Sequence, residues 1–177
     1  LSGRCFPPVK GNGANRTNLM TLPSSFFGRS QELNRLNELI SQVGAAVTLV
    51  GPGGMGKTTL ARRWTNNWVK ERSDWLDAVW FVDLSSVTDL DGMMTALAKV
   101  LGIALAKEVP NGDHRAQIGI ELAQRGNLLL ILDNAEQIVE LVAETILLLK
   151  SAAPKVRLIV TSRCPLNFQG EILLELE

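Results

Sequence analysis

One segment of the sequence has residue types and a spacing suited to binding phosphate. Residues 51–58 read Gly-Pro-Gly-Gly-Met-Gly-Lys-Thr and match the pattern G-x-x-x-x-G-K-[ST]. Glycines let the backbone turn so that successive N–H groups converge on an anion, and a following helix adds the positive end of its dipole. Lys57 can reach the β- and γ-phosphates, and the Thr58 hydroxyl can coordinate Mg²⁺. The predicted nucleotide contacts here are Gly51, Pro52, Gly53, Gly54, Met55, Gly56, Lys57, Thr58 and Thr59.

A phosphate-binding loop usually acts together with a bound metal ion, and Asp133 is the candidate ligand for that ion. It ends the most apolar run of the chain, residues 128–132. An acid at the end of a strand near the loop can hold Mg²⁺ directly or through water. The alternative role is to cap the helix that follows. We predict Thr58 and Asp133 as the metal ligands.

The residue after Asp133 is Asn134, at the place where fast ATPases carry a carboxylate that polarises the attacking water. A neutral amide is a poor base, so hydrolysis should be slow or need help. Glu136 is the nearest substitute acid, although it could simply stabilise the first turn of a helix. Arg163 ends another apolar run and could sense the γ-phosphate, or be an ordinary exposed arginine. The predicted catalytic residues are Lys57, Asp133, Arg163 and Glu136.

The elements that position these residues follow from the hydrophobic periodicity. Short β-branched runs alternate with amphipathic stretches, which implies an α/β fold with a parallel sheet and right-handed crossovers. Ser30 is predicted to cap the first helix. Trp64 and Trp68 lie four residues apart and are predicted to face the core. Strands are predicted at 46–50, 78–83, 128–132, 156–161 and 171–175, and helices at 30–43, 57–70, 89–101, 113–125 and 136–150.

The amino-acid composition argues against several classes of protein. The 177 residues are 46% hydrophobic and 20% charged with zero net charge, which argues against a disordered chain and a strongly basic nucleic-acid module. Two cysteines, Cys5 and Cys164, exclude a disulfide framework and favour a reducing, cytoplasmic location. The single histidine, His114, excludes a multi-histidine metal site and is predicted to be a solvated residue at a helix N-terminus. No apolar run reaches the roughly 18 residues of a membrane helix.

The chain is predicted to divide into two parts. Residues 1–21 contain prolines and glycines without periodicity and are predicted to be a linker or arm. Residues 22–177 are predicted to be the nucleotide-binding domain. Because the sequence begins with Leu1, we expect it to be one module of a longer protein.

Four motifs in order resemble one family: residues 26–29 (Phe-Phe-Gly-Arg), the glycine-rich loop, residues 130–134 (Leu-Ile-Leu-Asp-Asn) and residues 161–163 (Thr-Ser-Arg). The chain resembles STAND-class regulatory P-loop ATPases. More narrowly, it is similar to the nucleotide-binding domains of bacterial transcriptional regulators of the LuxR and AfsR type, and NB-ARC domains are more distant relatives. This resemblance implies a three-layer α/β/α P-loop NTPase fold with a five-stranded parallel sheet in the order 5-1-4-3-2. It also implies ATP or ADP with Mg²⁺ as ligands, and Phe27, Gly28 and Arg29 as contacts to adenine and ribose.

The resemblance also implies a function. Its members act as ATP/ADP switches, so we expect slow ATP hydrolysis that controls a larger signalling or transcription-regulating protein. The implied partners are C-terminal helical, winged-helix and effector domains, and the full-length protein is expected to self-associate with ATP. No membrane and no direct nucleic-acid partner is expected for this chain. The alternatives are an AAA+-like motor, which the missing acid after Asp133 disfavours, and a small-molecule or nucleotide kinase, which the scattered arginines disfavour.

Overall fold

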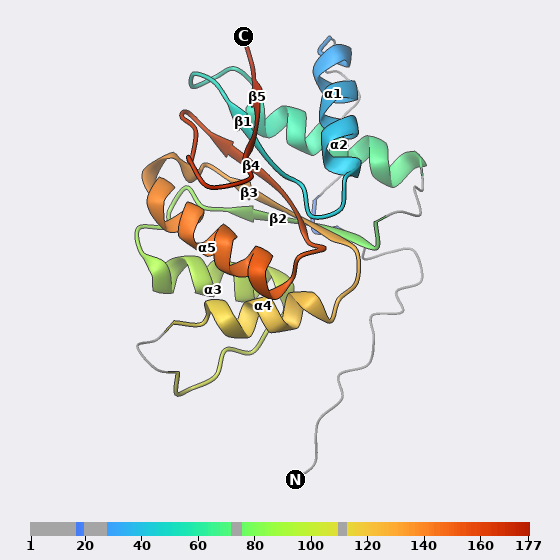
Figure 1. Ribbon diagram of the computed structural model, residues 1–177. Helices are drawn as coiled ribbons and strands as arrows, with labels where there is room; N and C mark the ends of the chain where they lie inside the picture. Colours follow the sequence, from blue (N-terminus) through green and yellow to red (C-terminus); the bar gives the residue numbers. More distant parts are fainter. Residues whose placement is uncertain (1–16, 20–27, 72–75, 110–112) are drawn as a thin grey trace.

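The five strands form one parallel sheet (Figure 1). The computed structural model describes residues 17–19, 28–71, 76–109 and 113–177. The strand order is β2-β3-β4-β1-β5, which is the predicted order 5-1-4-3-2 read from the other edge. The phosphate-loop strand therefore lies next to the strand that ends before Arg163, as predicted. The strands are β1 (Ala46–Val50), β2 (Ala78–Asp83), β3 (Leu128–Asp133), β4 (Arg157–Ser162) and β5 (Ile172–Glu175).

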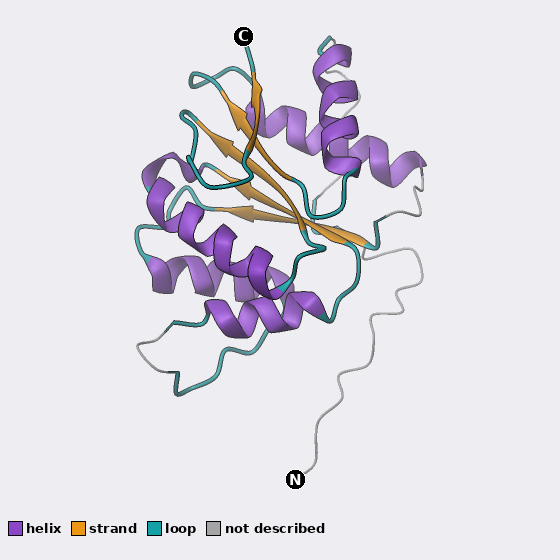
Figure 2. Cartoon of the chain, viewed as in Figure 1, coloured by secondary structure: helices purple, strands orange, loops and turns teal. Residues whose placement is uncertain are grey.

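Helices cover both faces of the sheet, so the predicted three-layer α/β/α architecture is confirmed (Figure 2). On one face lie α1 (Ser30–Ser41) and α2 (Lys57–Glu71). On the other face lie α3 (Leu90–Leu101), α4 (Arg115–Ala123) and α5 (Val139–Ala152). Within the described ranges, no helix combines the length and the apolarity needed to cross a bilayer.

Strand β3 shows why the strands of this sheet appear in the sequence as uninterrupted apolar runs. Leu128, Leu130 and Leu132 pack against the layer of α3, α4 and α5, whereas Leu129 and Ile131 pack against α1 and α2. All five side chains are buried because each face of a parallel sheet is covered by helices. On α2, Trp64 and Trp68 are each only 3% exposed, which confirms their predicted place in the core.

Three local predictions were wrong. Ser30 lies inside α1, whose N-cap is Arg29 in the left-handed region (φ 58°), so the Ser30 side chain makes no capping bond. The helix expected at 136–150 begins at Val139, because left-handed Asn134 (φ 63°) leads first into a 3₁₀ turn at Ala135–Gln137. His114 is buried rather than solvated, with Nδ1 3.4 Å from Gln117 Oε1 at the start of α4.

Part of the predicted linker is docked on the sheet edge. Thr17 forms a parallel bridge with Val79 of β2. The Asn18 side chain accepts a hydrogen bond from Phe81 N and donates one to Phe81 O, both at 2.8 Å. This segment therefore satisfies polar backbone groups on the outer edge of β2, where unpaired groups favour aggregation.

Candidate functional site

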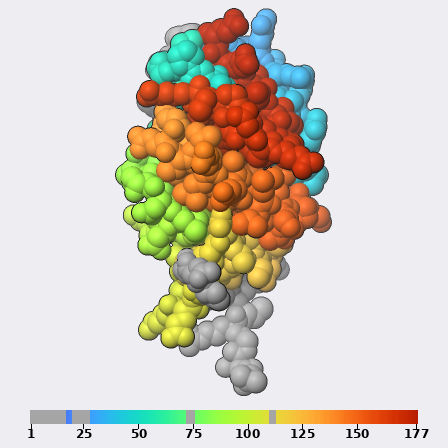
Figure 3. All heavy atoms as spheres, turned by 60° about the vertical axis from the view of Figure 1, so that its left-hand side comes forward, coloured from blue at the N-terminus to red at the C-terminus, as the bar shows by residue number. Residues whose placement is uncertain are grey.

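The phosphate loop connects β1 to α2 at the carboxyl edge of the sheet. Gly54 (φ 83°) and Gly56 (φ 80°) have left-handed backbones, and a Cβ on either would meet nothing within 4 Å. Both glycines are thus needed for backbone conformation, and they leave open space beside the loop. Gly51 is needed for a different reason, because a Cβ there would lie 2.7 Å from the Leu176 carbonyl oxygen. In Figure 3 the turquoise loop is on the surface, next to the red C-terminal segment.

The Lys57 side chain folds back onto the start of the phosphate loop. Its Nζ donates hydrogen bonds to Gly51 O (2.7 Å) and Pro52 O (3.0 Å), and the residue is 9% exposed. These acceptors are carbonyl oxygens, so the bonds hold the ammonium at the loop without neutralising its charge. An anion that enters the loop would meet this charge and the N-terminus of α2 together.

Asp133 joins the phosphate loop to the sheet. Its Oδ1 accepts hydrogen bonds from Thr58 Oγ1 (2.8 Å) and Thr161 Oγ1 (2.5 Å), and the residue is 2% exposed. Burial raises the pKa of Asp133, and the nearby charge of Asp83 raises it further, while the two hydroxyl bonds and the charge of Arg62 partly offset this rise. The two predicted metal ligands, Thr58 and Asp133, are therefore in direct contact.

Asn134 connects two carboxylates at the ends of neighbouring strands. Its Nδ2 donates to Asp133 Oδ2 (3.2 Å) and to Asp83 Oδ1 (3.3 Å), and its backbone N donates to Thr161 Oγ1 (3.0 Å). Asp83 was missed by the sequence reasoning, although it ends β2 directly opposite Asp133 in the β2–β3 register. The signal was available, because two predicted parallel strands both end in Asp and their carboxyl ends meet at one edge.

The environment of Asp83 favours its charged form. The partial loss of solvent around this carboxylate would by itself raise its pKa. Hydrogen bonds from Ser85 and Asn134, together with the charge of Arg62, outweigh this effect and lower the pKa. Arg62, also missed by the sequence reasoning, lies one helical turn after Thr58 on α2 with its guanidinium carbon 4.8 Å from the centre of the Phe81 ring. Its charge therefore acts on both strand-end carboxylates.

Arg163 and Glu136 meet beside the loop. Arg163 Nε lies 3.1 Å from Glu136 Oε1, and their side chains are 66% and 20% exposed. The Arg163 guanidinium also lies above Gly53, whose Cβ position would be 3.7 Å from Nη2. An exposed ion pair of this kind contributes about 0–1 kcal/mol, so it can open at little cost.

The remaining predicted contacts lie at the start of α1 and the start of α2. Arg29 Nη1 lies 3.2 Å from Glu32 Oε1, and its Nη2 donates to Glu177 O at 3.2 Å, which ties the start of α1 to the residues after β5. Gly28 is exposed with φ 94°, and Thr59 is half-buried in the first turn of α2. Phe27 lies outside the described residues.

The donor set fits Mg²⁺ bound together with a nucleotide. Among the described residues, no group of three or more His, Cys, Asp or Glu could hold a metal ion without a ligand. Mg²⁺ prefers oxygen donors and is commonly held by one or two protein groups, water and substrate phosphates. Thr58 Oγ1 and Asp133, which already share a hydrogen bond, supply oxygen donors of this kind beside the loop.

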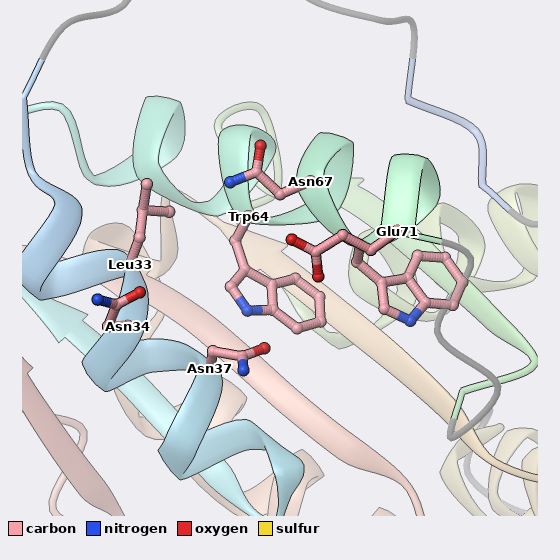
Figure 4. Close-up of a pocket in the computed structure, with 7 residues that line it drawn as sticks. Leu33, Asn34, Asn37, Trp64, Asn67 and Glu71 are labelled. Carbon is pink, nitrogen blue, oxygen red and sulfur yellow. The ribbon is translucent and has the colours of Figure 1, made fainter.

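A groove between α1 and α2 is a separate feature (Figure 4). Its volume is about 100 Å³, well below the roughly 300–1,000 Å³ of pockets for drug-sized ligands. It lies along the C-terminal half of α2 and includes no residue of the phosphate loop, so it is not the nucleotide site. Its lining residues are Leu33, Asn34, Asn37, Trp64, Asn67, Trp68 and Glu71.

Comparisons with known proteins agree with this geometry. The AAA domain family matches residues 40–165. A Mycobacterium bovis protein named "Putative HTH-type transcriptional regulator" is 31% identical over 128 residues, which cover 71% of this chain but 13% of that protein. The chain thus spans a small part of the length of this relative.

Solved structures share the fold at low sequence identity. A STAND ATPase with a tetratricopeptide repeat sensor from Pyrococcus horikoshii superposes with a TM-score of 0.57 at 18% identity, over 85% of this chain and 23% of that one. Cdc6p from Pyrobaculum aerophilum gives 0.61 at 17% identity, over 86% and 46%. The phosphate loop, the Thr58–Asp133 contact, the sheet order and the family match together show that the chain belongs to the AAA domain family and has the fold of P-loop ATPases.

Proposed function

We propose that this domain is a nucleotide-dependent switch: it binds ATP or ADP with Mg²⁺, hydrolyses ATP slowly, and so controls a larger regulatory protein. The observation that carries the proposal is the contact between Thr58 and Asp133 at 2.8 Å. It supports Thr58 and Asp133 as the residues that would hold Mg²⁺, which would help to neutralise the negative charge of the phosphates.

The proposed roles follow from the positions of the side chains. Lys57 would exchange its bonds to the Gly51 and Pro52 carbonyls for phosphate oxygens. Arg163 would turn from Glu136 toward the γ-phosphate, since the Arg163 side chain is 66% exposed and an ion pair with a solvated partner is weak. An interaction made only with the γ-phosphate distinguishes ATP from ADP, which is what a switch requires.

Slow hydrolysis is proposed from the residue that follows Asp133. The Asn134 side chain is a neutral amide, which is too weak a base to take a proton from water, and its Nδ2 donates to two carboxylates. Glu136 carries a carboxylate, but its Oε1 is paired with Arg163. A group of this kind would act as a base only after the ion pair opens.

The proposed partners lie outside this chain. The M. bovis relative is about eight times longer than the matched segment, since the match covers 13% of it, and its name is that of an HTH-type transcriptional regulator. The STAND structure includes a repeat sensor. We infer helical, winged-helix and effector domains as partners of the nucleotide site, a cytoplasmic location, and ATP-dependent self-association of the complete protein.

Two measurements test the switch. Mass spectrometry of the purified, denatured domain should identify co-purified ADP or ATP. Multiple-turnover hydrolysis should be far below about 1 s⁻¹, the low end for ordinary enzymes. Brisk turnover by the isolated chain, or transfer of phosphate to a small acceptor, would contradict the proposal and favour a motor or a kinase.

A further inference from the structure

We infer that Asp83 is the catalytic carboxylate of ATP hydrolysis in this domain, supplied by the strand next to Asp133 instead of by the residue that follows it. The inference rests on the proposed function, because it needs ATP at the phosphate loop. Three observations carry it: the register of β2 and β3, the hydrogen bonds of Asn134, and the exposure of Asp83.

The register places Asp83 beside the metal ligand. Asp83 and Asp133 are paired residues at the carboxyl ends of adjacent parallel strands. Asp133 is buried and has its Oδ1 occupied by two threonine hydroxyls, so it suits metal binding and not proton transfer. Asp83 is exposed at the same edge and is the nearer of the two carboxylates to solvent.

The Asn134 amide aligns the two carboxylates. Its Nδ2 lies 3.2 Å from Asp133 Oδ2 and 3.3 Å from Asp83 Oδ1. One amide group thus holds the base at a fixed place relative to the metal ligand. The left-handed backbone of Asn134 (φ 63°), a conformation that Asn tolerates better than most residues, directs the side chain to this position.

The step assigned to Asp83 is proton transfer during attack. The water oxygen forms a bond to the γ-phosphorus while the bond from that phosphorus to the β–γ bridging oxygen breaks, and ADP leaves. The water proton passes to the Asp83 carboxylate and then to the inorganic phosphate. The Asn134 amide, which donates to both carboxylates, can orient them but cannot take this proton.

A purely structural role for Asp83 makes a different prediction. Asp83 Oδ1 also accepts a hydrogen bond from Ser85 N at 2.9 Å, which shapes the turn after β2. Asp83→Asn keeps this acceptor oxygen and removes the basic carboxylate. Asp91→Asn is the matched control, because Asp91 is an exposed carboxylate in the first turn of α3.

The first test measures binding. The whole 177-residue chain and its variants are titrated calorimetrically with Mg²⁺ and ADP, with and without aluminium fluoride, which mimics the phosphoryl group under attack by water. Asp83→Asn should bind ADP as tightly as the wild type does. Aluminium fluoride should increase the affinity of the wild type for ADP, and this increase should be at least about tenfold smaller in the variant, since a general base contributes about 10²–10⁴-fold to stabilising the transition state. Asp91→Asn should match the wild type in both titrations.

The second test measures single-turnover hydrolysis. Asp83→Asn should hydrolyse bound ATP at least about tenfold more slowly, and Asn134→Asp in the same chain should restore part of the rate by placing a carboxylate at the same edge. Unchanged hydrolysis and aluminium fluoride binding in Asp83→Asn, or a wild type without any preference for aluminium fluoride, would overturn the inference. Failure of the wild type to bind ADP would instead overturn the proposed function.

Discussion

Thr58 and Asp133 are separated by 75 residues, yet Thr58 Oγ1 donates a 2.8 Å hydrogen bond to Asp133 Oδ1. The bond joins the first turn of α2 to the end of β3. Thr161 of β4 donates to the same oxygen, so the carboxylate connects α2, β3 and β4. The two proposed metal donors are thus already held together by the protein's own hydrogen bonds.

Replacing Lys57 with alanine should weaken nucleotide binding about tenfold or abolish it, because the loop loses its mobile cation. Titration with a fluorescent nucleotide measures the change. Lys70→Ala is the control, since Lys70 is an exposed lysine in the last turn of the same helix. Unchanged affinity in Lys57→Ala would contradict the assignment of residues 51–58 as a phosphate loop.

Asp133→Asn should remove the Mg²⁺ dependence of nucleotide binding while making the nucleotide-free domain more stable. The pKa of Asp133 is raised mainly by burial, so its ionised form destabilises the fold at neutral pH and this cost disappears as the pH falls through the raised pKa. We expect a higher Tm at pH 7, but by less than about 2–4 °C (the shift that about 1 kcal/mol causes in a chain of this size), because the introduced amide nitrogen would face the Asn134 Nδ2 donor that now lies 3.2 Å from Asp133 Oδ2. Thermal unfolding followed by circular dichroism should show that the increase shrinks on acidification; a lower Tm at pH 7 would refute the burial argument.

Gly51→Ala should destabilise the domain. The added Cβ would lie 2.7 Å from the Leu176 carbonyl oxygen, so β1 and the segment after β5 must separate. Overpacking of this kind costs about 1–3 kcal/mol, which urea unfolding measures. Gly53→Ala should unfold like the wild type, because its Cβ would meet only the Arg163 guanidinium at 3.7 Å.

Arg163→Ala should weaken ATP binding more than ADP binding. The guanidinium lies beside Gly53 and is held by a weak ion pair to Glu136, so it is free to contact a γ-phosphate. We expect about a tenfold loss for ATP, the size of one charge-assisted contact, and no change for ADP. Paired calorimetric titrations measure both constants, with Arg35→Ala on the exposed face of α1 as control. An equal loss for both nucleotides would exclude a role as γ-phosphate sensor.

The ion pair of Asp113 and Arg115 should stabilise the fold only above acidic pH. Hydrogen bonds from the Arg115 side chain lower the pKa of Asp113, so its stabilisation is present above the unfolded-state pKa of about 3.9 and is lost as the pH falls through the lower folded-state pKa. Asp113→Asn should reduce the Tm slightly at pH 7, because partly exposed pairs contribute about 0–1 kcal/mol. Urea midpoints across the acid range should converge; a difference that persists at the lowest pH would show a contribution unrelated to charge.

The fold class and the residues of the phosphate loop could be predicted from the amino-acid sequence. Local patterns carry this information: apolar runs of strand length predict buried parallel strands, and the glycine spacing with Lys57 and Thr58 predicts the loop. The strand order came from the family resemblance, and it is confirmed. Asp133 was predictable because it ends the most apolar run, and that place puts it at the ligand edge of a parallel sheet.

Helix boundaries were less predictable from the sequence. Ser30 is a good cap by residue type, but the left-handed Arg29 begins the helix. Glu136 reads as the first turn of a helix, yet the left-handed Asn134 inserts a 3₁₀ turn before Val139. In both cases a non-glycine residue in the left-handed region precedes the helix, and residue-type preferences do not predict such a conformation.

The side chains that meet at this edge of the sheet could not be predicted from local patterns. Asp83 ends a predicted strand, but it becomes part of the site only because β2 lies in register with β3. Arg62 is unremarkable in the sequence, and it reaches the site because α2 places it over Phe81. The pairing of Arg163 with Glu136 is decided in the same way. Such contacts join residues far apart in the chain, and their geometry depends on the packing of the sheet and its helices, which a single-sequence pattern does not contain.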